Sequence, residues 1–98
     1  MDPRLKSSRW QKARAAVLAD EPVCQCCAHR GKAQPATQVD HITPRADAPD
    51  RFFDRLNLWA LCRSCHDMKS QLEQQGHRSE NRESWAGFIA HHLHRRGR

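Results

Sequence analysis

Four of the five cysteines in this chain form two C-x-x-C pairs, Cys24 with Cys27 and Cys62 with Cys65. A C-x-x-C turn brings two thiolates to one ion, and two such turns complete a closed tetrahedral Zn²⁺ site. No apolar stretch near the N-terminus resembles a secretory signal, so we expect a reducing compartment, in which thiolates bind metal rather than form disulfides. Cys26 pairs poorly with Cys24 and is assigned as a free thiol beside the site. Two buried disulfides or unliganded thiols are the alternatives to structural zinc.

The apolar content of the chain shows why a metal is needed. Leu, Ile, Val and Phe make up 15 of the 98 residues, below the roughly 20% at which a highly charged chain is expected to be disordered. No apolar run approaches the roughly 20 residues that cross a bilayer. We therefore expect one small domain, residues 1–98, without a membrane partner and with a core too small to fold it unaided.

The formal net charge of +6 is distributed unevenly. Residues 1–19 carry +4 and residues 78–98 carry +3, whereas residues 20–77 carry −1. Basic ends around a nearly neutral centre favour a polyanion such as nucleic acid as the partner, with a merely solubilising surface as the alternative.

Hydrophobic periodicity and turn residues predict an α+β order of elements. Residues 1–22 form a basic N-terminal segment. Its helix is capped by Ser8, runs to about Ala19 and places Trp10 and Val17 on its apolar face. A zinc-stabilised core follows over residues 23–76, and a basic C-terminal helix and tail occupy residues 77–98. Within the core we expect strands over 37–42 and 56–61, a loop that partly buries two phenylalanines, and a helix from Ser64 that stops at Gly76; the last helix begins at about Ser79.

The insertion between the cysteine pairs contains a second group of chemically active residues. Asp40 and His41 adjoin each other at a predicted strand; fifteen residues separate His41 from Asn57, and eight separate Asn57 from His66. Because His66 directly follows Cys65, a zinc ion at the cysteines would fix it in the first turn of its helix. Lys69 lies one turn further along the same face.

These residues in this order resemble the HNH endonucleases, and in particular the small four-cysteine HNH proteins of phages and prophages. The resemblance covers about Val23 to Lys69 through the pieces C-Q-C-C, V-D-H-I, N-L and L-C-R-S-C-H-D-M-K. It implies a ββα-metal (His-Me finger) fold, which agrees with the predicted strand–loop–strand–helix order. Ala28 departs from the glycine often found there in the family, and the Gly-Gly often seen before the asparagine is absent.

The resemblance also implies a role for each residue in phosphodiester hydrolysis. His41 is the candidate general base, because a neutral imidazole accepts a proton near pH 7. Asp40 and His66 are the candidate ligands of a catalytic divalent cation (Mg²⁺, Mn²⁺ or Ni²⁺), a mixed oxygen and nitrogen pair that leaves positions open for water and phosphate. Asn57 orients the His41 segment. Both Asp40 and His41 can serve one phosphate only if the strand ends or twists there, because neighbouring strand residues point to opposite faces.

Four basic residues are the candidate nucleic-acid contacts: Arg63, Lys69, Arg9 and Lys12. Phosphate contacts of this kind position a duplex without reading its sequence, so we expect DNA as the partner and low sequence specificity. The resemblance further suggests proteins of phage packaging or restriction as partners, and the cytoplasm of a bacterium or of a phage-infected cell as the location.

Non-catalytic interpretations of these residues stay open. Asp40 or Asn57 could cap a turn, His41 could be a structural histidine, and His66 could be an alternative zinc ligand. The chain would then be a zinc-knuckle module that binds nucleic acid or protein without cutting. Trp10 and Trp85 are expected in the core, and three histidines of the C-terminal helix and tail, His91, His92 and His94, are expected in solvent.

Overall fold

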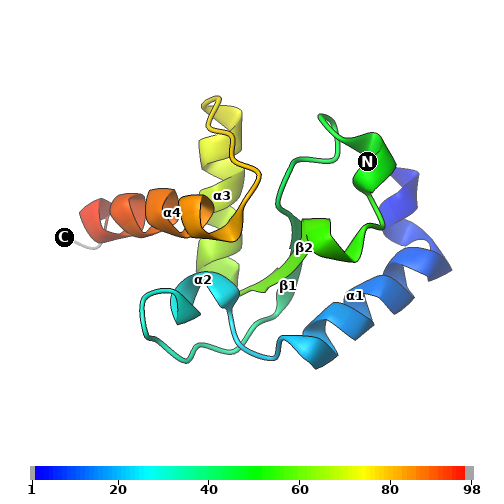
Figure 1. Ribbon diagram of the computed structural model, residues 1–98, viewed down its shortest axis with the longest axis horizontal. Helices are drawn as coiled ribbons and strands as arrows, with labels where there is room; N and C mark the ends of the chain where they lie inside the picture. The colour runs from blue at the N-terminus through cyan, green and yellow to red at the C-terminus, as the bar shows by residue number, and fades with distance from the viewer. Residues whose placement is uncertain (1, 97–98) are drawn as a thin grey trace.

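The computed structural model describes the backbone of residues 2–96 and the side chains of residues 2–93. His94 and the arginines at 95, 96 and 98, part of the expected basic tail, therefore have side chains outside the described residues. The elements follow one another as a short 3₁₀ turn η1 (Pro3–Lys6), α1 (Ser8–Asp20), α2 (Gln25–Ala28), β1 (Gln38–His41), the 3₁₀ turns η2 (Pro49–Arg51) and η3 (Arg55–Asn57), β2 (Leu58–Leu61), α3 (Arg63–Gln74) and α4 (Arg82–Arg96) (Figure 1).

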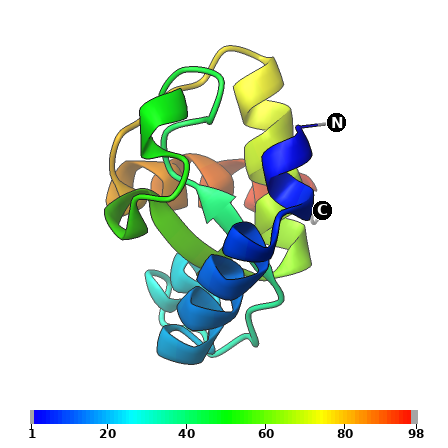
Figure 2. The same ribbon diagram turned by 90° about the vertical axis from the view of Figure 1, so that its right-hand side faces the viewer.

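The two strands form an antiparallel pair that separates two apolar clusters. Asp40 pairs with Trp59, and His41 pairs with Leu58. All four residues of β2 are buried, because the strand is covered on both faces. Leu58 and Ala60 pack with residues of α1, whereas Trp59 and Leu61 pack with the cysteines, α3 and α4. Figure 1 shows α1 on one side of the strands and α3 and α4 on the other, and Figure 2, viewed from the α1 side, shows that helix crossing in front of the strands.

Helix α1 packs the apolar face that its sequence predicts. Trp10 and Val17 are buried, and Ala13 packs against the same cluster. The N-cap is Ser7 rather than Ser8: the Ser7 backbone is extended, and its hydroxyl oxygen accepts a hydrogen bond from the N–H of Trp10 at 3.1 Å. The side-chain cap thus lies one residue earlier than predicted, because an N-cap residue has non-helical backbone and Ser8 is already helical.

The two C-terminal helices agree with the predicted faces but differ at their ends. Met68 and Leu72 of α3 are buried, as are Trp85 and Ile89 of α4. Gly76 follows α3 with a φ of 94°, a backbone conformation that favours glycine and ends the helix. Helix α4 begins at Arg82 and not at Ser79, because Asn81 Oδ1 accepts a hydrogen bond from the N–H of Ser84 and residues 79–81 form the preceding turn.

A loop with two 3₁₀ turns connects the strands and buries Phe52, while Phe53 is half-buried, in agreement with the expected partly buried pair. Both strands are shorter than predicted: residues 37 and 42 lie outside β1, and residues 56 and 57 belong to η3 rather than to β2. Over residues 2–96, no helix combines the length and the apolarity needed to cross a membrane.

Candidate active site and metal centre

The two C-x-x-C pairs converge on one point between α2 and the start of α3. The sulfur atoms of Cys24, Cys27, Cys62 and Cys65 all lie within 4.8 Å of one another, and Cys27 Sγ is 3.9 Å from Cys62 Sγ and 3.7 Å from Cys65 Sγ. A tetrahedron with Zn–S bonds of about 2.3 Å has sulfur–sulfur edges of about 3.8 Å. All five cysteines are free thiols, so the geometry suits structural zinc and excludes the disulfide interpretation.

Arg30 and Cys26 lie next to this cysteine cluster. Arg30 Nη2 donates to Cys27 Sγ at 3.4 Å and lies 4.0 Å from Cys65 Sγ. A zinc tetrathiolate carries a net charge of −2, which the guanidinium partly offsets. Cys26 is fully buried next to the cluster but is not one of its four members, as predicted. His66 is also outside the four, which argues against the alternative that it binds the same ion.

Asp40 points from β1 toward α3. Its Oδ2 accepts a hydrogen bond from Trp59 Nε1 at 3.1 Å and forms an ion pair with Lys69 Nζ at 2.8 Å. Its Oδ1 lies 3.9 Å from His66 Nε2. Because a small divalent cation forms bonds of about 2.1 Å to oxygen or imidazole nitrogen, one ion can contact two atoms at this separation. The donor set, one carboxylate and one imidazole on two different elements, fits the predicted catalytic metal.

His41 points from the end of β1 toward α1, opposite to Asp40. The imidazole stacks on Trp10 with ring centroids 5.2 Å apart and contacts Phe52 at 4.6 Å. Its Nε2 lies 3.0 Å from the carbonyl oxygen of Phe52. A carbonyl only accepts, so this nitrogen carries the proton and Nδ1 is left as the basic atom. Burial, the largest influence, lowers the pKa of His41 below its ordinary value, which favours the neutral imidazole that a general base needs.

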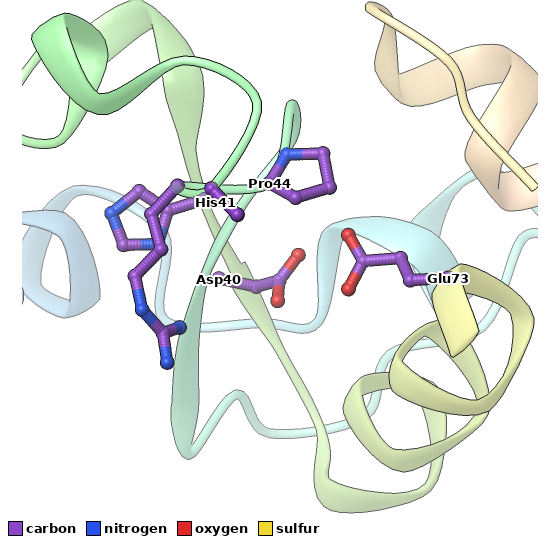
Figure 3. A pocket seen from close by; sticks show the side chains of 6 residues that line it. Asp40, His41, Pro44 and Glu73 are labelled. Carbon is purple, nitrogen blue, oxygen red and sulfur yellow. The ribbon is translucent and has the colours of Figure 1, made fainter. Parts of the chain in front are cut away.

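A cavity of about 260 Å³ brings the two residues to one site. It is lined by Asp40, His41, Pro44, Arg45, Ala46 and Glu73. Figure 3 shows the carboxylates of Asp40 and Glu73 turned toward each other, with His41 and Pro44 beside them. Both members of the Asp40–His41 pair line this space at the end of β1, although their side chains leave the strand in opposite directions.

Asn57 is fully buried and acts on the backbone beyond His41. Its Oδ1 accepts from the N–H of Thr43 at 2.8 Å, and its Nδ2 donates to the carbonyl oxygen of Thr43 at 3.1 Å. Its own carbonyl oxygen accepts from the N–H of Ile42 at 2.8 Å. Asn57 therefore holds the segment that leaves the strand, which suits the predicted orienting role.

The predicted phosphate contacts fall into two groups. Arg9 and Lys12 are exposed on α1, with the Arg9 guanidinium 3.9 Å from the centroid of the Phe53 ring, and Arg63 is 80% exposed at the start of α3, 3.5 Å from Asp67. Lys69 differs, because its side chain is 0% exposed and its ammonium is bound to protein oxygens. A direct phosphate contact by Lys69 is therefore wrong for this structure.

Two charged residues of the cavity were not predicted. Glu73 lies one turn after Lys69 on the same face of α3; burial raises the pKa of its carboxyl group, against the opposing effect of Lys69. The i, i+4 spacing of Glu73 from Lys69 could have predicted that the two side chains lie on the same face of the helix. Arg45 stands in a loop after β1, with Nε 3.4 Å from Asp2 Oδ2. No periodicity indicates where a loop side chain points, so Arg45 gave no signal.

Comparisons with known proteins match this site to one family. The family model described as HNH endonuclease matches residues 24–72, which is half of the chain. A solved structure, described as the HNH endonuclease of the deep-sea thermophilic bacteriophage GVE2 with manganese ion, is 36% identical and superposes with a TM-score of 0.72. The match covers 76% of this chain and 83% of that one.

The chain belongs to the HNH endonuclease family. No curated protein sequence matches it. The matched region of this HNH endonuclease begins and ends close to the predicted segment, 23–69, and contains both the cysteine cluster and the Asp40–His66 pair. The β-hairpin followed by α3, joined through four cysteines, is the ββα-metal fold predicted for it. As a member of this family the HNH protein is a phosphodiester hydrolase that binds DNA.

Proposed function

We propose that this HNH protein is a metal-dependent DNA endonuclease in which His41 is the general base and Asp40 and His66 hold the catalytic cation. The observation that supports this most directly is the 3.9 Å separation of Asp40 Oδ1 and His66 Nε2, next to the cavity that His41 lines. A divalent cation bound there would supply positive charge to a phosphate and to the leaving 3′-oxygen. The solved bacteriophage relative was crystallised with manganese, so Mn²⁺ is the first ion to test, followed by Mg²⁺ and Ni²⁺.

Each residue of the site has a separate role in the proposed hydrolysis. The basic nitrogen of His41 takes a proton from the attacking water, which then adds to phosphorus as the bond to the 3′-oxygen breaks. The hydrogen bond to the Phe52 carbonyl and the stacking on Trp10 hold the imidazole in one orientation. Asn57 fixes the chain just beyond the base through both polar atoms of its amide. Arg45 places a positively charged side chain in the cavity lining, where it is available to contact a phosphate oxygen.

The wider setting of the enzyme follows from its charge and relatives. We propose that exposed basic side chains, Arg9, Lys12 and Arg63, hold DNA through its phosphates, so that sequence specificity is low. Residues 1–98 act as one nuclease domain. A role in phage or prophage biology, in genome packaging or restriction within the bacterial cytoplasm, is proposed from the likeness to the bacteriophage protein.

Cleavage of supercoiled plasmid tests the proposed function. Wild-type protein is incubated with Mn²⁺, Mg²⁺, Ni²⁺ or EDTA, and the same series is run with His41→Ala. We expect metal-dependent cleavage that falls by about 10²–10⁴-fold in His41→Ala, the usual contribution of a general base. The matched control is His29→Ala, because His29 is an exposed histidine away from the cavity.

Two results would contradict the proposal. Equal cleavage by wild type and His41→Ala would remove His41 as the base. No cleavage by wild type with any ion, from protein that retains its zinc and binds DNA, would favour the zinc-knuckle binding module instead.

A further inference from the structure

Lys69 is a fully buried lysine at the centre of the site. Its Nζ donates to the carbonyl oxygen of His41 at 2.7 Å and to Glu73 Oε2 at 2.6 Å, and it forms an ion pair with Asp40 Oδ2 at 2.8 Å. It also lies 4.4 Å from the centroid of a Trp85 ring. The side chain is 0% exposed, so these three protein oxygens, and no solvent, are the polar partners of its ammonium. Its function is therefore internal to the protein.

The ammonium contacts both functional residues through atoms that do no chemistry. At Asp40 it binds Oδ2, which also accepts from Trp59, and this leaves Oδ1 directed to His66. At His41 it binds the main-chain oxygen and leaves the imidazole on the other side of the strand. One group on α3 thus sets the orientation of the metal-binding carboxylate and the backbone position of the base.

Glu73 completes the arrangement. A charged ammonium is costly to bury unless it is paired and hydrogen-bonded. Glu73 supplies a second carboxylate one helical turn after Lys69, and the face of Trp85 provides a further favourable contact. The group is therefore held in one place from three sides: β1, α3 and α4.

We propose that Lys69 is a positioning residue for the reaction, which orients Asp40 toward the catalytic cation and fixes the end of β1 that carries His41. This inference rests on the proposed function, since it assigns the cation to Asp40 and His66. It replaces the direct phosphate contact that the sequence suggested for Lys69.

Removal of the ammonium separates positioning from simple charge balance. A lysine that served only as a positive charge would repel a divalent cation, so Lys69→Met would bind Mn²⁺ more tightly. A positioning lysine predicts the opposite, because Asp40 loses its fixed orientation. We expect Mn²⁺ binding to weaken by about 10–100-fold, the usual effect of removing a residue that orients a metal ligand.

Two measurements carry the test. Mn²⁺ binding is followed by electron paramagnetic resonance without DNA, and kcat and the half-saturating Mn²⁺ concentration are obtained from plasmid cleavage. We expect Lys69→Met to raise the half-saturating concentration and to lower kcat at saturating Mn²⁺ by about 10-fold or more. Lys32→Met, which removes an exposed lysine outside the site, should match wild type in both.

Folding is controlled by zinc content and far-ultraviolet circular dichroism. If Lys69→Met fails these checks, Lys69→Met/Glu73→Gln removes the charge together with one counter-charge, and the same expectations apply. Mn²⁺ binding that is unchanged or tighter in the folded variant overturns the inference while the proposed function stands. A wild type that neither binds Mn²⁺ nor cleaves DNA overturns both.

Discussion

At the residue scale, the site depends on the pleat of β1 at Asp40 and His41. Asp40 and His41 are neighbours, but their side chains leave opposite faces of β1, toward α3 and α1 respectively. The carboxylate thereby meets a histidine, a lysine and an indole N–H, whereas the imidazole enters an aromatic cluster. Two adjacent residues thus acquire different environments, one polar and charged and the other largely desolvated, as an acceptor for a cation and a neutral base require.

The environment of His41 predicts the pH dependence of cleavage. Burial is the largest influence and lowers the pKa of His41, and Arg45 and Lys69 act in the same direction, while the contact with Phe52 and the charge of Asp40 oppose it. The imidazole therefore stays neutral below the ordinary histidine pKa of about 6.5, and activity falls only as pH drops through the lower, folded-state value. We expect the acidic limb of kcat at saturating Mn²⁺ to have its midpoint below 6.5. A midpoint above 7 would contradict the role given to burial.

At the element scale, α3 carries most of the site on one helix. Cys65 belongs to the cysteine cluster, His66 follows it, and Lys69 and Glu73 come one and two turns later. The cluster anchors the first turn of α3, and helical periodicity then places the other groups against the end of β1. Helix α1 contributes differently, because it buries Trp10 against His41 and exposes its basic side chains to solvent.

The exposed face of α1 predicts a salt-dependent contribution to DNA binding. Arg9→Ala/Lys12→Ala, made in a His41→Ala background that does not cut, should weaken binding to a short duplex for all sequences alike. The slope of log K against log salt should become less negative by roughly 0.9 for each phosphate that the variant no longer neutralises. Fluorescence anisotropy over a salt series measures both quantities, with Lys32→Ala as the matched control. An unchanged slope would show that α1 does not bind the duplex.

At the scale of the whole molecule, the cysteine cluster joins parts that a small core could not hold. The buried residues form two clusters on opposite faces of β2, and the cysteines belong to only one of them. Structural zinc supplies about 10–16 kcal/mol of apparent binding free energy at neutral pH, comparable to the entire net stability of a typical domain, about 5–15 kcal/mol. A low apolar content is therefore compatible with a fold that zinc at these four cysteines would stabilise.

Loss of one thiolate should consequently unfold the protein. We expect Cys62→Ser, or removal of zinc from wild type by a strong chelator, to abolish zinc binding and most of the helical circular dichroism signal. Cys26→Ala is the matched control, since Cys26 is buried beside the cluster but is not one of its four members; it should retain one zinc per chain. Native helicity and a normal melting transition in Cys62→Ser would refute structural zinc.

Boundaries of elements were the least predictable part of the fold. The buried faces of α1, α3 and α4 agree with periodicity, because helical spacing repeats over several turns and tolerates local error. The ends do not repeat in this way. The hydroxyl of Ser7 rather than Ser8 caps α1, and Asn81 starts α4 later than predicted, since each end depends on one side chain that reaches one backbone N–H.

Local spacing in the chain was sufficient to identify the cysteine cluster, the Asp40–His41 and His66 groups, and the order strand–loop–strand–helix. Such features depend on covalent distance and on periodicity, which the amino-acid order contains directly. The burial of Lys69, the approach of Glu73 and the presence of Arg45 in the cavity were decided by tertiary structure. A lysine and an arginine carry the same charge in the sequence, and only the packing of β1, α3 and α4 around one of them determines which is enclosed and which lines the cavity.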